Sequence, residues 1–249
     1  MKIAVTGKGG SGKTTISGTL ARHLAGEGRE VIAIDADPNP NLGTSVGLAP
    51  EDTEAIVPIL NGLLASGFTH HDVRPTAEEL LTRFGVAAPD GIVLIATARI
   101  ERPTDACLCC GSHTTSRHFF ADVPDAGRVV IADLEAGLSD LVWANPGADD
   151  VVLVVTEPSA KSVQVALHSC RMAESLGVRR ILGVASQWPG GDDASHLRDV
   201  LGVEVMRVGE DEAVKRADRA GLALIDEEPD SRAVSEIRAL AEWLDYNAL

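Results

Sequence analysis

Residues 7–15 read Gly-Lys-Gly-Gly-Ser-Gly-Lys-Thr-Thr, which is the pattern of a phosphate-binding loop. The apolar run Ile3-Ala4-Val5 precedes the loop, and a helical pattern from Ile16 to Leu24 follows it. This order predicts a strand, a glycine-rich turn and a helix, whose N-terminal dipole and backbone N–H groups attract an anion. A glycine-rich turn without a ligand is the alternative. The succession of strand, loop, Lys-Thr and helix favours phosphate binding over that alternative.

The loop predicts a role for several of its residues. Gly9, Gly10 and Gly12 let the backbone bend so that several N–H groups face one anion. We expect Lys13 to neutralise β- and γ-phosphates and the Thr14 hydroxyl to hold Mg²⁺. The predicted nucleotide contacts within the loop are Gly7, Lys8, Gly9, Gly10, Ser11, Gly12, Lys13, Thr14 and Thr15.

Composition narrows the class of protein. The chain has 249 residues, of which 45% are hydrophobic, so a large folded core is expected and intrinsic disorder is not. The net charge of −15 disfavours a nucleic-acid surface and a polybasic membrane patch, since both need clustered Lys and Arg. No apolar run has the length of a membrane span, and the N-terminus enters an apolar run without a signal peptide. We therefore expect a cytoplasmic protein that binds neither nucleic acid nor membrane.

Continuous apolar runs alternate with helical patterns along the chain. The runs predict strands buried on both faces, at Val31–Ile34, Ile92–Ala96, Val129–Ala132, Val151–Val155 and Ile181–Ala185. The helical patterns cover Thr15–Ala25, Ala160–Leu176, Asp193–Leu201, Glu212–Ala220 and Arg232–Tyr246. This alternation predicts an α/β fold: one P-loop domain over residues 1–249, with a mostly parallel sheet and helices on both faces. We expect an irregular insertion at about 50–90.

Acidic residues follow two of the predicted strands. Asp37 lies two residues beyond Asp35, at the edge of the sheet where ligands bind in such folds, and is the candidate to orient an attacking water or to hold the Mg²⁺ shell. A helix cap or a plain Asp-Pro turn is the alternative. Asp133 ends another strand and is expected to orient Mg²⁺ through its water shell. Gly137, four residues later, allows close approach to a γ-phosphate.

Three motifs together carry a family resemblance. The loop, Asp35-Ala36-Asp37-Pro38 and Asp133-Leu134-Glu135-Ala136-Gly137 resemble the deviant Walker A ATPases, which include MinD, ParA, the nitrogenase iron protein and CooC. The resemblance implies a slow, switch-type ATPase that uses ATP and Mg²⁺. It also implies that Lys8 crosses a homodimer interface to the partner's nucleotide and acts in catalysis with Lys13 and Asp37. ATP would then hold the dimer together and hydrolysis would switch it.

A cysteine cluster, Cys107-Leu108-Cys109-Cys110, is the second informative feature. In an extended segment Cys107 and Cys109 point to one side, and two subunits could together supply four thiolates to Zn²⁺ or Ni²⁺. Cys110 is a further candidate ligand. A cysteine group without a ligand is the alternative. Cys170 stands among apolar neighbours and is expected in the core.

The cysteine spacing resembles the CooC type, and so do other stretches, Thr156-Glu157-Pro158-Ser159 and Gly209-Glu210-Asp211 among them. That resemblance implies a metallochaperone that inserts metal, nickel above all, into a client enzyme such as carbon monoxide dehydrogenase. It places Gly209 and Glu210 beside the adenine. The family has Asn-Lys where Ser186-Gln187 stands here, so Gln187 is the candidate amide for the base. A MinD/ParA-type regulatory or positioning switch without a metal role, and an electron-transfer protein with a bridging iron–sulfur cluster, are the alternatives.

Overall fold

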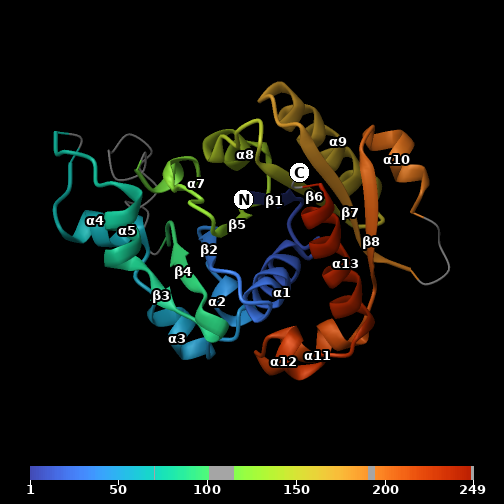
Figure 1. Ribbon diagram of the computed structural model, residues 1–249, viewed down its shortest axis with the longest axis horizontal. Coiled ribbons are helices and arrows are strands. Elements are labelled where there is room, and N and C mark those ends of the chain that lie inside the picture. Colours follow the sequence, from blue (N-terminus) through green and yellow to red (C-terminus); the bar gives the residue numbers. More distant parts are fainter. Residues whose placement is uncertain (70, 101–114, 190–193, 248–249) are drawn as a thin grey trace.

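A single sheet forms the centre of the computed structural model, which describes residues 1–69, 71–100, 115–189 and 194–247 (Figure 1). Its eight strands lie in the order β3-β4-β2-β5-β1-β6-β7-β8. Neighbouring strands are parallel, except that β3 runs antiparallel to β4. The strands are β1 (Lys2–Gly7), β2 (Val31–Ala36), β3 (Val86–Ala87), β4 (Val93–Ala96), β5 (Val129–Leu134), β6 (Val151–Thr156), β7 (Arg180–Trp188) and β8 (Glu204–Gly209). The predicted α/β class and mostly parallel sheet are confirmed.

The central strands are apolar on both faces, because helices cover both sides of the sheet. Successive side chains of a strand point to opposite faces. In β1, accordingly, Ile3 and Val5 enter one hydrophobic cluster and Ala4 enters the other. This double burial explains why the sequence shows continuous apolar runs in place of alternating ones.

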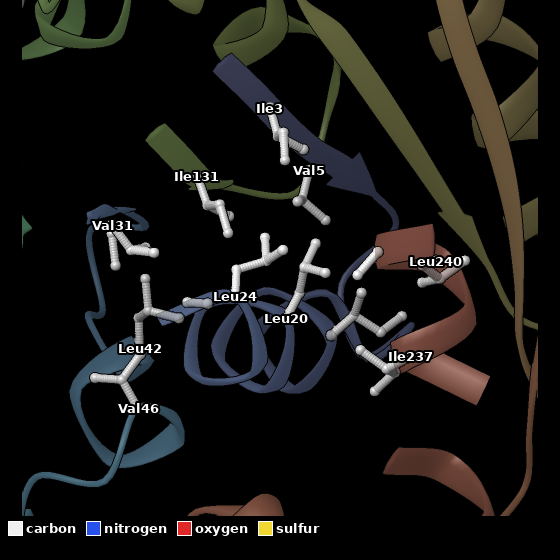
Figure 2. Packing of buried hydrophobic residues seen from close by; sticks show 14 of the residues in the cluster. Ile3, Val5, Leu20, Leu24, Val31, Leu42, Val46, Ile131, Ile237 and Leu240 are labelled. Atoms are coloured by element: carbon white, nitrogen blue, oxygen red, sulfur yellow. The ribbon is translucent and has the colours of Figure 1, made fainter. Parts of the chain in front are cut away.

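The first face is covered by α1 (Lys13–Gly26), α2 (Leu42–Ser45) and α13 (Arg232–Tyr246). In Figure 2, Leu20 and Leu24 of α1 lie between the strand residues Ile3, Val5 and Ile131 and the side chains of the other two helices. The helix α13 buries the stripe Ile237, Leu240, Ala241 and Leu244, as its periodicity predicts. The connection from β8 to α13 carries α11 (Glu212–Ala220) and α12 (Leu224–Glu227).

The second face is covered by α4 (Ile59–Ala65), α5 (Ala77–Phe84), α7 (Phe119–Asp122), α8 (Leu138–Ala144), α9 (Ala160–Ser175) and α10 (His196–Leu201). Cys170 is fully buried in α9, so the expectation of a core cysteine is confirmed. None of the helices built from the described residues combines the length and the apolar character needed to cross a membrane.

Two expectations about organisation differ from the structure. The segment of about 50–90, expected to be irregular, holds α3 (Pro50–Ala55), α4, α5, the short strand β3 and the 3₁₀ turn η1 (Pro89–Gly91). Its clearest sequence signal is the capping box of α5, in which Thr76 and Glu79 satisfy each other's backbone N–H groups. The strand β8 was not expected either. Its edge position leaves Glu204 exposed and Arg207 partly exposed, and these charged residues interrupt the apolar run.

Candidate functional site

The glycine-rich loop joins β1, at the centre of the sheet, to α1. Gly7 packs against β6 so closely that a Cβ there would lie 2.2 Å from the carbonyl oxygen of Val155. Gly12 precedes α1 with φ +93°, a left-handed conformation that glycine adopts without a Cβ penalty. The loop closes through a hydrogen bond that the Ser11 N–H donates to the Lys8 carbonyl at 3.2 Å. The first amides of a 14-residue helix are thereby directed at the space above the sheet.

Lys13 is nearly buried, with 7% of its surface exposed. Within the described chain its ammonium makes one long hydrogen bond, 3.4 Å to the carbonyl oxygen of Lys8. An ammonium group has three donors, and burial without partners is costly. Ser11 Oγ, close by in the loop, is buried and has no hydrogen-bond partner among the described residues. Unfilled donors beside a glycine loop are what a bound polyphosphate would satisfy, so these residues fit that group.

Asp133 lies at the end of β5, beside α1. Its two carboxylate oxygens accept hydrogen bonds from Thr14 Oγ1 at 2.6 Å and from Ser17 Oγ at 3.1 Å. Burial raises the pKa of Asp133 to about 6, although the hydrogen bond from Thr14 and the charge of Lys13 oppose that rise. A hydroxyl and a buried carboxylate in contact are the oxygen ligands that a Mg²⁺ ion and its water shell use in P-loop proteins.

Asp35 and Asp37 stand where β2 ends. Asp35 lies beside Asp133 in the parallel register and is 2% exposed. Burial, followed by the charge of Asp133, raises the pKa of Asp35 to about 7. Its oxygens accept the N–H groups of Leu42 at 2.8 Å and of Asp37 at 3.2 Å. The Asp37 carboxylate is more open and accepts the Asn39 N–H at 2.8 Å, so the acid nearer to solvent is the one that sequence reasoning selected.

One cavity of about 470 Å³ runs from the glycine loop to the start of α11, a size typical of a small-molecule site. Val208 of β8 and Val214, Ala233 and Ile237 of the helices give its far end apolar surface. Ten of the sequence-predicted residues line it: Gly9, Gly10, Gly12, Lys13, Thr14, Thr15, Asp37, Gln187, Gly209 and Glu210. The other predicted residues Gly7, Lys8, Ser11, Asp133 and Gly137 are not part of that lining. Ala136, next to Gly137, is part of it.

Three contacts at the site were not found from the sequence. Lys8 Nζ forms an ion pair with Glu157 Oε1 at 2.6 Å within the same chain. Gln187 Nε2 donates a hydrogen bond to the Gly10 carbonyl at 2.7 Å. Glu135 and Asp140 share a hydrogen bond, and burial, followed by their interaction with each other, raises the pKa of Glu135. The first two contacts join segments that the sheet order brings together, and the third joins residues on either side of the turn between β5 and α8.

The predicted cysteine site lies outside the described residues, because Cys107, Cys109 and Cys110 fall within 101–114. Within 1–69, 71–100, 115–189 and 194–247, no group of three or more His, Cys, Asp or Glu side chains is placed to hold a metal ion. Mg²⁺ in a P-loop needs no such group, since a threonine hydroxyl, phosphate oxygens and water fill its shell.

Comparisons with known proteins agree with this geometry. Residues 2–239 match the model of the CobQ/CobB/MinD/ParA nucleotide binding domain. The chain is 32% identical to the carbon monoxide dehydrogenase accessory protein CooC of Rhodospirillum rubrum, over 93% of this chain and 92% of that protein. It is 31% identical to an uncharacterized ATP-binding protein of Methanocaldococcus jannaschii, over 98% of this chain and 97% of the other.

The fold has close counterparts among solved structures. The septum site-determining protein MinD of Pyrococcus horikoshii, solved with Mg-ADP, superimposes with a TM-score of 0.76 at 18% identity, over 98% of this chain and 95% of that one. At that identity the likeness concerns the fold. The family match extends over most of the chain and includes the glycine loop, β5 and the strand ends that carry the acids. The chain therefore belongs to the CobQ/CobB/MinD/ParA family of P-loop ATPases.

Proposed function

We propose that the protein is a homodimeric, Mg²⁺-dependent ATPase that carries metal to a client metalloenzyme. The observation that carries this proposal is the 32% identity with a carbon monoxide dehydrogenase accessory protein over nearly all of both chains. The sequence adds Cys107-Leu108-Cys109, a thiolate pair suited to a shared metal site. We propose nickel as the cargo, carbon monoxide dehydrogenase as the client and the cytoplasm as the location.

The nucleotide would lie in the cavity that begins at the glycine loop. The backbone N–H groups of the loop and the ammonium of Lys13 would hold its phosphates. Bound Mg²⁺ would supply positive charge that neutralises the β- and γ-phosphates. Thr14 would hold that ion directly, and Asp133 and Asp37 through its water shell. Val214 and Ile237 give an apolar surface for a planar base near Gly209 and Glu210.

Hydrolysis needs a positioned water and a stabilised charge. Asp37 lines the cavity and is partly exposed, which supports the proposal that its carboxylate would orient water near the phosphates. Lys13 is buried, and its ammonium donates a hydrogen bond to the Lys8 carbonyl of the loop. The Lys8 side chain is 37% exposed, and in this scheme it would leave Glu157 for a second chain's nucleotide. We propose that this exchange makes ATP a clamp between two subunits.

The cargo site would form when two chains meet. Cys107 and Cys109 of each subunit would provide four thiolates for Ni²⁺ or Zn²⁺, and Cys110 offers a further thiol. Dimerisation by ATP would then assemble the site, and hydrolysis would open it. The metal is the protein's substrate in this scheme.

The test combines molecular mass with metal content. Purified protein is titrated with Ni²⁺ or Zn²⁺, with and without Mg-ATP, and analysed by light scattering and elemental analysis. We expect one metal ion per dimer, and we expect Cys107→Ala combined with Cys109→Ala to abolish metal binding. A Cys170→Ala variant is the control, because that thiol is buried in α9. Unchanged metal binding in the double variant would refute the metal role.

Family membership also allows a regulatory or positioning switch of the MinD/ParA type. That function needs the same nucleotide site and the same dimer, but no thiolates. It predicts that a membrane, DNA or a protein activator stimulates hydrolysis, and that the double cysteine variant behaves as the unsubstituted chain does. The metal titration therefore separates the two functions.

A further inference from the structure

Gln187 reaches from the end of β7 to the glycine loop. Its amide nitrogen lies 2.7 Å from the carbonyl oxygen of Gly10, 177 residues away in the sequence. A carbonyl oxygen only accepts hydrogen bonds, so the NH₂ end of the Gln187 amide faces the loop. The contact uses one of the two N–H donors of the amide that the sequence assigns to a nucleobase, and it directs the nitrogen end of that amide to the loop.

The backbone at Gln187 holds this side chain in place. Gln187 has φ +56°, in the left-handed region that non-glycine residues rarely adopt. It is the extra residue of a bulge, because Ser186 and Trp188 both pair with β8 while Gln187 does not. Ser186 and Trp188 are 4% and 3% exposed, so buried neighbours fix the strained residue on both sides. The Trp188 carbonyl also accepts the Glu210 N–H at 3.1 Å.

The contact fixes one peptide unit of the loop at both ends. The Gly10 carbonyl is held by Gln187, and the N–H of the same peptide, on Ser11, is held by the Lys8 carbonyl at 3.2 Å. The strand end also touches the loop at Gly12, where an added Cβ would lie 2.9 Å from Ser186 Oγ. A fixed peptide plane between Gly10 and Ser11 sets the direction of the amides that follow it.

We propose that Gln187 is a positioning residue, which holds the glycine loop in its phosphate-binding shape, and that it does not select the base. The inference rests on the proposed nucleotide site. Gln187 would act on every ligand that carries the polyphosphate, whatever its base. The choice of base would depend on the other end of the cavity, around Val214 and Ile237.

The test uses one ligand that has no base. Mg²⁺ complexes of ATP, GTP and inorganic tripolyphosphate are titrated by calorimetry into the unsubstituted protein and into Gln187→Gly. Glycine accepts the positive φ, so this variant keeps the backbone conformation while it loses the amide. We expect about fivefold weaker binding of all three ligands, the effect of one hydrogen bond, and an unchanged ATP-to-GTP ratio. A changed ratio with unchanged tripolyphosphate affinity would overturn the proposal.

Three further variants separate the hydrogen bond from side-chain shape. Asn tolerates left-handed φ but is one methylene shorter, so Gln187→Asn is expected to match Gln187→Gly. Gln187→Glu keeps the length and places an acceptor opposite the Gly10 carbonyl, so it is expected to bind tripolyphosphate more weakly than either. If Gln187→Glu bound tripolyphosphate as tightly as the unsubstituted protein does, the proposal would be overturned. Gln164→Ala, at an exposed glutamine of α9, is the control and should change nothing. No binding of any of the three ligands to the unsubstituted protein would refute the nucleotide site itself.

Discussion

Lys8 Nζ lies 2.6 Å from Glu157 Oε1, so the lysine that the family resemblance assigns to a partner's nucleotide is paired within its own chain. Glu157 follows β6 and Lys8 follows β1, and these strands are neighbours in the sheet. The hydrogen bond from Lys8 is the main reason that the pKa of Glu157 is lowered, with a smaller contribution from Ser159. If Lys8 reaches a partner's nucleotide, as proposed, dimerisation must break this pair in each subunit.

Removal of the Glu157 charge should therefore favour the dimer. A partly exposed ion pair contributes about 0.5–1 kcal/mol, and two pairs break in each dimer, so Glu157→Gln should tighten Mg-ATP-dependent dimerisation by roughly tenfold. Lys8→Ala should abolish it. Sedimentation equilibrium with Mg-ATP measures both effects, with Glu174→Gln, at an exposed glutamate of α9, as the control. Dimerisation that is equally strong in all three variants would show that Lys8 does not cross the interface.

The buried acids Asp35 and Asp133 make the stability of the nucleotide-free protein depend on pH. Burial raises both folded-state pKa values above the ordinary 3.8, to about 7 and about 6. The folded chain then binds more protons than the unfolded chain between about pH 4 and 7, so the free energy of unfolding should fall as the pH rises through that range. From pH 5 to 7 the loss for the two groups together is roughly 3–4 kcal/mol, or roughly 10 °C in the unfolding midpoint.

Asp35→Asn tests which group is responsible. The variant should show a smaller decrease of the midpoint between pH 5 and 7, measured by differential scanning fluorimetry without nucleotide. Asp199→Asn, at an exposed aspartate of α10, should keep the full decrease. The slope of the curve is the quantity to compare, because Asn alters the hydrogen bonds that Asp35 accepts and so shifts the midpoint at every pH. Equal slopes in all three proteins would contradict the prediction.

The sequence predicts those parts of the fold that local pattern determines. Continuous apolar runs gave the interior strands, because helices bury both of their faces. The edge strand β8 was missed, since its partly exposed residues carry no such run. The loop, Asp37 and Asp133 could be predicted as candidates because a motif or a strand end marks each of them. The contacts of Lys8 with Glu157 and of Gln187 with Gly10 join residues 149 and 177 positions apart, and they depend on the order of strands, which no local pattern encodes.

Arg22 should be important for stability but not for nucleotide binding. Arg22 lies in α1 and is buried. Its guanidinium donates hydrogen bonds to Asp90 at 2.7 Å and to both carboxylate oxygens of Asp226 at 2.7 Å. The hydrogen bond that Arg22 donates to the Asp226 carboxylate is the main reason that the pKa of Arg22 is raised. Arg22→Leu leaves two carboxylates without their partner, although both remain partly hydrated, so we expect a loss of about 3 kcal/mol in the free energy of unfolding.

The surface pair of Arg29 and Asp245 is the matched control. Its members are 31% and 53% exposed in their side chains, and Arg29→Leu should cost less than about 1 kcal/mol. Urea unfolding at pH 7.5 measures both variants, and Mg-ATP titration should find unchanged affinity in each. Equal losses of stability in the two variants would show that burial of Arg22 adds nothing to its ion pairs.

Cys170 should not react with a thiol reagent in the folded protein. The number of thiols that do react then reports on the other cysteines alone. Burial raises the pKa of its thiol to about 12, so almost no reactive thiolate forms near pH 8. The chain has four cysteines. With an aromatic disulfide reagent, at most three thiols per chain should therefore react in the folded protein, and four should react in denaturant. If Cys107 and Cys109 hold the cargo, Ni²⁺ with Mg-ATP should lower the native count by two per chain. Cys170→Ala should give the same native counts, with and without metal.

A native count that falls by one in Cys170→Ala would show that the α9 thiol reacts. A count unaffected by metal would remove the cysteines from the proposed function.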